Sequence, residues 1–222
     1  MPMAGLRVRH HVLVRFKLLS PGQQARLAGN PGKTDLAGIM THQESDMTQD
    51  RLARISPDQA NAAQKRVIDR LGAGRGRIPT PFNIWLHSPR LAEGMEIIGT
   101  HIDADSTLTQ AESEIAILST AVHWNAPYVI ANHQKHALKA GLGEEVVAAI
   151  LDRRRPDGLS GRLGVVADAV WDILNGGMVG DVAFVRYDTE LGRELIAELL
   201  VTIGYFTSVS LAMSLHALAP KA

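Results

Sequence analysis

ESEIAILSTAVHWNAPYVIANHQKHALKAGLGEEVVAAI, residues 112–150, decides the fold of this chain. Just before it, Thr109 is spaced from Glu112 as in a capping box, which satisfies the first free N–H groups of a helix. Pro127 suits the first turn of a second helix, which Gly141 ends as a glycine stop. The acidic pair that follows this glycine is typical of a third helix start. The stretch therefore predicts three consecutive helices.

The same signals predict helices along most of the remaining chain. A serine cap followed by proline occurs at Ser56 and again at Ser88, and each predicts a helix start. Apolar residues follow helical spacing from Val165 to Leu174. A cap at Asp188 predicts a final long helix that runs to about Ala217. Since no stretch shows the sustained alternation of a strand, the chain is predicted to be all-α with a long C-terminal helix.

Composition is that of an ordinary globular protein and excludes several functions. Of the 222 residues, 45% are hydrophobic and 21% are charged, and the formal net charge is zero. A neutral chain lacks the basic surface that binds nucleic-acid phosphates, so we expect no nucleic-acid partner. The chain has no cysteine, which excludes disulfide bonds, thiolate metal sites and a cysteine nucleophile. This is compatible with the cytoplasmic location that we expect.

The chain is predicted to divide into an N-terminal extension and one domain. Residues 1–50 lack the long apolar centre and cleavage site of a secretory signal, and we expect them to be poorly ordered. Residues 51–222 are predicted to form the helical domain. The apolar run from Leu195 to Leu218 is long enough to span a membrane. Its polar residues, Glu198 and His216 among them, favour a buried core helix instead, so no membrane association is expected.

Glu114 and His133 are the residues that we predict to carry chemistry. On the second helix, Val129, His133 and His136 share one face because they are three or four residues apart. An antiparallel pair of helices joined by the short turn at Pro127 would bring Glu114 level with His133. A carboxylate beside an imidazole fixes the tautomer of the ring, which is the usual arrangement for proton transfer near neutral pH.

Structural and metal-binding roles stay open for the same residues. A histidine on an apolar helix face is often a hydrogen-bonded core residue, and Glu114 in a first turn can simply favour the helix dipole. His133 and His136, three residues apart, could also bind a metal ion. No third ligand lies at a telling interval, and His101 and His123 are candidates only by proximity. We therefore predict no metal and no other cofactor.

Four further residues are weaker candidates for substrate contact. Asn83 and His87 lie in an irregular segment flanked by prolines, and such segments host binding sites disproportionately. Tyr128 follows the turn between the first two helices, and His136 lies one turn after His133. Packing or capping is the ordinary alternative for each of them.

Several short motifs of this chain have a recognisable order and spacing. They are NIWLHSPRLA (83–92), Leu108, ESEIAIL (112–118), NAPY (125–128) with His133, AxxAGL (137–142), EEVVAAI (144–150) and ELIAELLVTIGYFTSV (194–209). Together they resemble the carboxymuconolactone decarboxylase family, which includes the alkylhydroperoxidase D-like proteins. The resemblance covers roughly residues 55–220.

The resemblance implies an alkylhydroperoxidase D-like helical bundle that assembles as a homo-oligomer, commonly a trimer or hexamer. In the peroxidase branch of the family, two cysteines precede the histidine by seven and four positions, where this chain has Ala126 and Val129. Glu114 matches the proton-relay glutamate of that branch, and His133 matches its histidine. Without a thiolate, neither a sulfenic acid nor a disulfide can form. Cysteine-dependent peroxide reduction is therefore not expected.

These observations lead to one main functional hypothesis and two alternatives. The main hypothesis is a lyase or decarboxylase-like enzyme for a small organic acid or lactone, with His133 as general acid or base and Glu114 orienting it. The first alternative is a non-catalytic binding or assembly protein that kept the scaffold. It predicts that His133 packs without a cavity or a carboxylate partner. The second alternative is a metal-dependent variant.

Overall fold

The computed structural model describes residues 51–218 and residue 220, and these residues form helices and no strand. The helices are α4 (Ala62–Arg75), α5 (Phe82–Trp85), α6 (Pro89–Thr100), the π-helical turn η1 (His101–Asp105), α7 (Gln110–His123), α8 (Pro127–Lys139), α9 (Glu144–Leu151), α10 (Gly161–Asn175) and α11 (Asp181–Leu215). The predicted all-α class and long C-terminal helix are confirmed. The predicted N-terminal extension, residues 1–50, lies outside the described residues.

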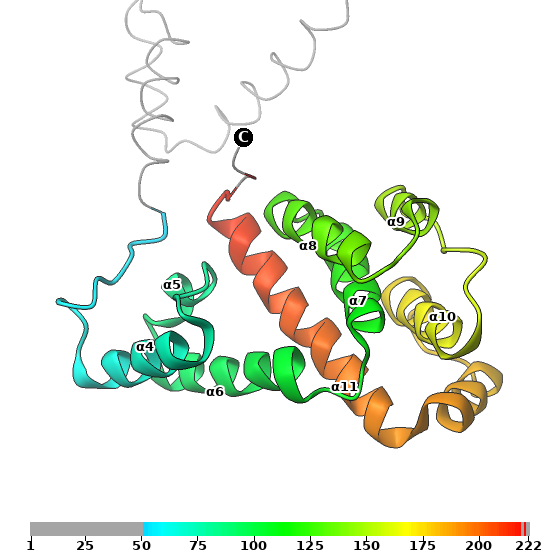
Figure 1. Ribbon diagram of the computed structural model, residues 1–222, viewed down its shortest axis with the longest axis horizontal. Helices are drawn as coiled ribbons and strands as arrows, with labels where there is room; N and C mark the ends of the chain where they lie inside the picture. Colours follow the sequence, from blue (N-terminus) through cyan, green and yellow to red (C-terminus); the bar gives the residue numbers. More distant parts are fainter. Residues whose placement is uncertain (1–50, 219, 221–222) are drawn as a thin grey trace, which may run out of the picture. The chain divides into compact units, whose positions relative to one another are not determined.

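Helix α7 is the centre of the described domain. Ten of its 14 residues are buried, and it packs mainly against α8, α10 and α11, which surround it in Figure 1. The helix begins at the predicted capping box. The Thr109 N–H donates to Glu112 Oε2 at 2.8 Å, and the Glu112 N–H donates to Thr109 Oγ1 at 3.3 Å. The capping box thus starts the most buried helix at the predicted residue.

The start of α7 is also tied to α10 by a buried carboxylate. Arg162 donates from Nε and a terminal nitrogen to the two oxygens of Glu112, at 2.7 and 2.8 Å. Burial by itself would raise the pKa of Glu112, but the hydrogen bonds from Arg162 and Thr109 outweigh it and hold this pKa below its ordinary value. This contact fixes the first turn of α7, and Glu114 lies two residues after Glu112 on the same helix.

Apolar side chains form two clusters, and α7 contributes to both. Ile115 and Leu118 belong to the cluster that also contains residues of α9 and α10. Ile117 and Ala121 belong to the second cluster, with residues of α4, α5, α6, α8 and the end of α11. Different faces of α7 are therefore buried in the two clusters, and this helix holds the two halves of the domain together.

Helix α11 begins earlier than predicted and is kinked. It starts at Asp181, and Gly192 interrupts it with φ +79° and ψ 161°, a backbone conformation that glycine adopts readily and other residues do not. Figure 1 shows the change of direction in this helix. The predicted start at Asp188 was wrong because the Asp-Thr-Glu pattern fits a helix interior as well as a cap. In the structure, the Asp188 carboxylate pairs with Arg193 beside the kink.

The first described helix, α4, begins later than predicted. The predicted cap, Ser56, forms a turn in which its Oγ donates to Gln59 Oε1 at 3.1 Å. The helix starts at Ala62 instead, where Asn61 and Gln64 make a reciprocal capping box. Both sequences have the chemistry of a cap, so the local pattern alone does not choose between them.

Among the described residues, α11 is the one helix that is long and apolar enough to cross a membrane. This is a weak indication, because core helices of globular proteins meet the same criterion. Of the most apolar 18-residue stretch of this helix, 39% is buried. Leu199 and Met213 are each 1% exposed, and the helix packs on α6, α7 and α8. One side of α11 is therefore a core face, as predicted.

Candidate functional site

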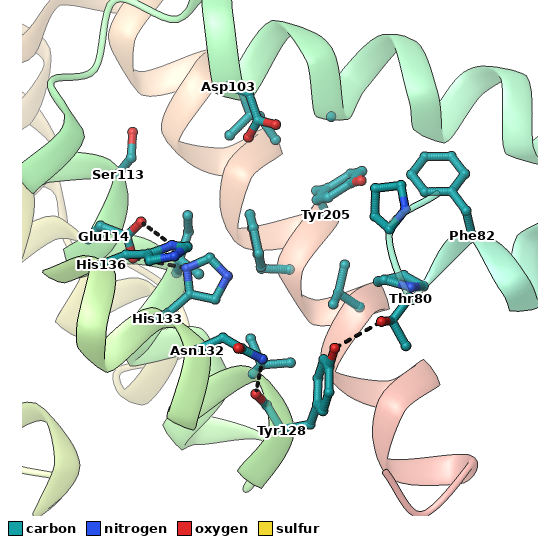
Figure 2. A pocket seen from close by; sticks show the side chains of 18 of the residues that line it. Thr80, Phe82, Asp103, Ser113, Glu114, Tyr128, Asn132, His133, His136 and Tyr205 are labelled. Atoms are coloured by element: carbon teal, nitrogen blue, oxygen red, sulfur yellow. Dashed lines mark hydrogen bonds and ion pairs between the residues drawn. The ribbon is translucent and has the colours of Figure 1, made fainter. Parts of the chain in front are cut away.

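A cavity of about 450 Å³ lies beside the N-terminal part of α7. Its walls come from segments that are far apart in the sequence, namely residues 77–82, η1, α7, α8 and the C-terminal half of α11. Figure 2 shows polar and aromatic side chains from these segments around a common space. Cavities of this size and mixed lining are typical of small-molecule sites.

Glu114 and His133 form a hydrogen-bonded pair on the wall of this cavity. His133 Nδ1 lies 2.9 Å from Glu114 Oε2. Because a carboxylate only accepts hydrogen bonds, Nδ1 carries the proton and donates it. Figure 2 shows the rest of the imidazole, with its second nitrogen Nε2, pointing into the cavity. The predicted proximity of the two side chains is confirmed, and the geometry leaves Nε2 available to a bound molecule.

The second oxygen of Glu114 has its own partners. Gln110 Nε2 donates to Glu114 Oε1 at 3.0 Å, and His136 Nδ1 lies 3.7 Å from the same oxygen. Glu114 is only 1% exposed, and a buried carboxylate is stable in its charged form only where such partners compensate for lost water. The three partners therefore hold a negative charge at the cavity wall.

Aromatic contacts hold the imidazole of His133 in place. The Phe206 ring lies edge-to-face with it, at 5.0 Å between centroids and 81° between planes. The ring of His136 lies 5.3 Å away on the same helix. The His133 side chain is 17% exposed. With Nδ1 bound to Glu114 and Phe206 against the ring, His133 has little freedom to leave this orientation.

The lining also includes hydroxyl groups and two further charged residues. The hydroxyl groups of Tyr128 and Thr80 are hydrogen-bonded at 2.9 Å and connect α8 with the segment before α5, as Figure 2 shows. Arg77 and Asp103 also line the cavity, and both are exposed. The lining therefore offers hydrogen-bonding groups and charges of both signs to a polar ligand.

Two of the four predicted substrate contacts line the cavity and two do not. Tyr128 and His136 are part of the lining. Asn83 donates from Nδ2 to the Thr80 carbonyl at 3.0 Å, and His87 Nε2 lies 3.0 Å from a backbone carbonyl of the chain preceding α4. Asn83 and His87 therefore lie outside this cavity, and both side chains bond to backbone carbonyl groups instead.

Several residues that line the cavity were not predicted from the sequence. Gln110 lies four residues before Glu114 on the same helix, a spacing that places two side chains on one face, so a signal for it was present. Thr80 and Phe206 reach the cavity only through the packing of distant segments. No local pattern marks them.

The two positions that the resemblance aligns with the cysteines of the peroxidase branch are packed in this chain. Ala126 is fully buried and Val129 is 2% exposed. Both belong to the second apolar cluster, and Val129 also lines the cavity. At these positions the chain thus has core side chains next to the Glu114–His133 pair.

A third possible metal ligand lies near His133 and His136, although no residue stands at a telling sequence interval from them. One ligand atom of each of Glu114, His133 and His136 lies within 4.8 Å of the others. Glu114 comes from the preceding helix, 19 residues before His133, so its sequence interval did not mark it as a ligand.

No known family model matches the chain, and no curated protein matches it. The resemblance to the carboxymuconolactone decarboxylase family stays a prediction from its motifs.

Proposed function

We propose that the chain is a carboxymuconolactone decarboxylase-like enzyme that acts on a small organic acid or lactone and is not a cysteine peroxidase. His133 is the general acid or base, and Glu114 is its positioning partner. The proposal depends on one observation: His133 Nδ1 is bound to a buried carboxylate at 2.9 Å while Nε2 faces a cavity. An imidazole held in this way is the common proton-transfer group of enzymes.

The pair can supply the proton that a decarboxylation requires. When a carboxylate in the β position to a carbonyl group loses CO₂, the C–C bond breaks and its electron pair moves into an enolate. Protonation of carbon then completes the reaction. His133, charged beforehand by a solvent proton, delivers this proton from Nε2. Glu114 stabilises the imidazolium because it places a negative charge at Nδ1.

The remaining lining fits an acidic, oxygen-rich substrate. Arg77 brings a guanidinium, which pairs well with a carboxylate. The Tyr128 and Thr80 hydroxyl groups bond to each other, which uses one of their two protons. The hydroxyl that accepts this bond can still donate its own proton to a substrate oxygen. We assign substrate contact to Arg77, Tyr128 and His136.

We also propose that the chain acts as a homo-oligomer, a trimer or hexamer, in the cytoplasm. Leu200, Leu211 and Leu215 are 50%, 47% and 75% exposed and lie within about 60° of each other around α11, given 3.6 residues per turn. Such an apolar stripe supports burial against another copy. Light scattering on the purified chain is expected to give a trimer or hexamer mass, and a monomer at every concentration would contradict it.

Turnover by the metal-free His133→Gln variant is the test of the enzymatic role. Chelator-treated wild-type protein is screened against small carboxylates and lactones by thermal shift, and ligands that raise the melting temperature are assayed for turnover. Loss of the proton-transfer group is expected to lower kcat by about 10²–10⁴-fold. His123→Gln, which replaces an exposed histidine outside the cavity, should leave kcat unchanged.

The same experiment separates the enzyme from the non-catalytic alternative. A binding protein would be stabilised by ligands but would turn none of them over. Equal turnover by wild type and His133→Gln would leave an enzyme whose chemistry does not use His133, and the proposed role of this residue would be wrong.

A further inference from the structure

Glu114, His133 and His136 bring three metal-ligating atoms to one point of the cavity wall. His133 Nδ1 lies 2.9 Å from Glu114 Oε2, and His136 Nδ1 lies 3.7 Å from Glu114 Oε1. All three ligand atoms lie within 4.8 Å of one another. Figure 2 shows both imidazole rings turned toward the carboxylate. The cluster therefore combines two nitrogen donors and one anionic oxygen donor.

These spacings are close to those that a zinc ion requires. Zinc binds histidine nitrogen and carboxylate oxygen at about 2.0–2.2 Å, so tetrahedral ligands lie about 3.4 Å apart. The distance from Glu114 to His133 Nδ1 is shorter than this value, and the distance to His136 Nδ1 is longer. Small rotations of the two imidazole rings would bring both distances to the value that zinc requires. Three protein ligands leave the fourth position for water or a ligand, as in open zinc sites.

The surroundings of the cluster also suit a cation. Glu114 places a negative charge in a position that is 1% exposed, and Gln110 Nε2 holds its other oxygen at 3.0 Å, which is how outer partners orient a metal-binding carboxylate. The His136 side chain is 59% exposed, so an ion can enter from solvent. Imidazole and carboxylate donors favour zinc, nickel, cobalt and copper over magnesium and calcium.

We propose that Glu114, His133 and His136 bind one divalent transition-metal ion and that this ion inhibits the proton transfer by His133. The inhibition rests on the proposed function, whereas the binding site does not. In the metal-free chain, the proton on Nδ1 leaves Nε2 with a free electron pair facing the cavity. An ion on Nδ1 takes the place of that proton. The neutral ring then carries its proton on Nε2 and has no free electron pair, so it is no longer a base. It also cannot form the imidazolium that delivers the proton in the proposed reaction, because loss of the Nε2 proton would leave an imidazolate instead of a neutral ring.

Zinc binding to the whole chain tests the site without any substrate. Chelator-treated protein is titrated with zinc chloride by calorimetry, and cobalt(II) absorption reports the coordination. Glu114→Gln, His133→Gln and His136→Gln should each weaken zinc binding by about 10–100-fold. His136→Gln is the most informative change, because this side chain is the exposed one and the Glu114–His133 pair remains. Melting temperature and circular dichroism verify that each variant is folded.

Matched controls separate this site from other histidines of the chain, which has nine in all. His123→Gln and His101→Gln should retain wild-type affinity for zinc, because neither histidine belongs to the cluster. Zinc affinity that is unchanged in a folded His136→Gln variant would overturn the proposed site. So would the absence of saturable zinc binding to the wild-type chain.

The proposed inhibition by zinc is measured with any compound that the thermal-shift and turnover screen identifies as a substrate. One equivalent of zinc should lower turnover at least tenfold, and a chelator should restore it. In His136→Gln, the zinc concentration needed for inhibition should rise by the same factor as the dissociation constant. If zinc binds at this site and turnover does not fall, the inhibition is refuted and the site remains. If zinc does not bind while His133→Gln is inactive, the site is refuted and the proposed function remains.

Discussion

Glu114 has the most demanding environment of the described side chains at the site. It is 1% exposed and yet contacts polar groups from Gln110, His133 and His136. A buried carboxylate without partners would be strongly unfavourable, so each partner contributes both to stability and to the direction in which the carboxylate points. Changes to the partners should therefore affect stability and chemistry together.

Replacement of Gln110 by Ala tests this coupling. The change removes the donor to Glu114 Oε1 and is expected to lower the free energy of unfolding by about 1–2 kcal/mol, as for a hydrogen bond to a charged group. Because Glu114 then orients His133 less firmly, kcat should fall roughly tenfold. Urea denaturation and steady-state kinetics measure the two effects. Lys135→Ala, an exposed change on α8, should alter neither quantity.

Arg77 offers a second test at the scale of a single residue. If its guanidinium binds the substrate carboxylate, Arg77→Gln should raise KM about 10-fold or more and change kcat much less, because the interaction is present in both the ground and transition states. Arg90→Gln, at an exposed arginine outside the cavity, is the control. Equal KM values for wild type and Arg77→Gln would remove Arg77 from the substrate site.

At the scale of the elements, the ends and breaks of helices position the site. The capping box of Thr109 and Glu112 starts α7 at Gln110, four residues before Glu114, and Pro127 starts α8 so that His133 faces Glu114. The kink at Gly192 redirects α11, whose C-terminal half carries Tyr205 and Phe206 to the cavity. The site therefore depends on where three helices begin or turn.

The kink predicts opposite effects for two glycines of α11. Gly192 has φ +79°, which strains any other residue even though nothing lies within 4 Å of an added Cβ. Gly192→Ala should lower the free energy of unfolding by about 1–3 kcal/mol. Gly204 lies in the helical part with the same open space around it, so Gly204→Ala should raise stability by about 0.5–1 kcal/mol. Denaturant titrations of both variants provide the comparison, and destabilisation by both changes would contradict it.

At the scale of the molecule, Asp168 connects three segments that lie away from the cavity. Arg155, from the loop after α9, donates to Asp168 Oδ1 at 2.9 Å, and Arg186, from the first part of α11, donates to Oδ2 at 2.7 Å. Burial alone would raise the pKa of Asp168 in α10. The hydrogen bonds from the two arginines outweigh it and hold this pKa below its ordinary value of 3.8.

This lowered pKa predicts how stability changes with acid. The folded chain keeps the Asp168 carboxylate charged to a lower pH than the unfolded chain does. The stabilisation that this charge provides is therefore complete above about pH 4 and is lost as the pH falls through the pKa of the folded state. Asp168→Asn should lower the free energy of unfolding by about 1–3 kcal/mol at pH 7. The difference in the free energy of unfolding between Asp168→Asn and the wild-type chain should become smaller below pH 4. Asp152→Asn, in an exposed pair with Arg154, should show neither effect.

The sequence determined the helical class, the start of α7 and the meeting of Glu114 with His133. These features are local: caps define helix ends, and an antiparallel turn at Pro127 fixes which residues of the two adjoining helices face each other. The start of α11 was misplaced because helix interiors and caps share the same acidic residues near Asp188. The start of α4 was misplaced as well, because Ser56 and Asn61 both begin a pattern with the chemistry of a cap.

Only the tertiary structure decided the cavity and its complete lining. Thr80 meets Tyr128 across 48 residues of sequence, and Phe206 reaches His133 from the last helix. Such contacts depend on how helices pack, and packing between distant segments leaves no periodic mark in either of them. The same reason applies to His87, whose ring bonds to a backbone carbonyl 34 residues away.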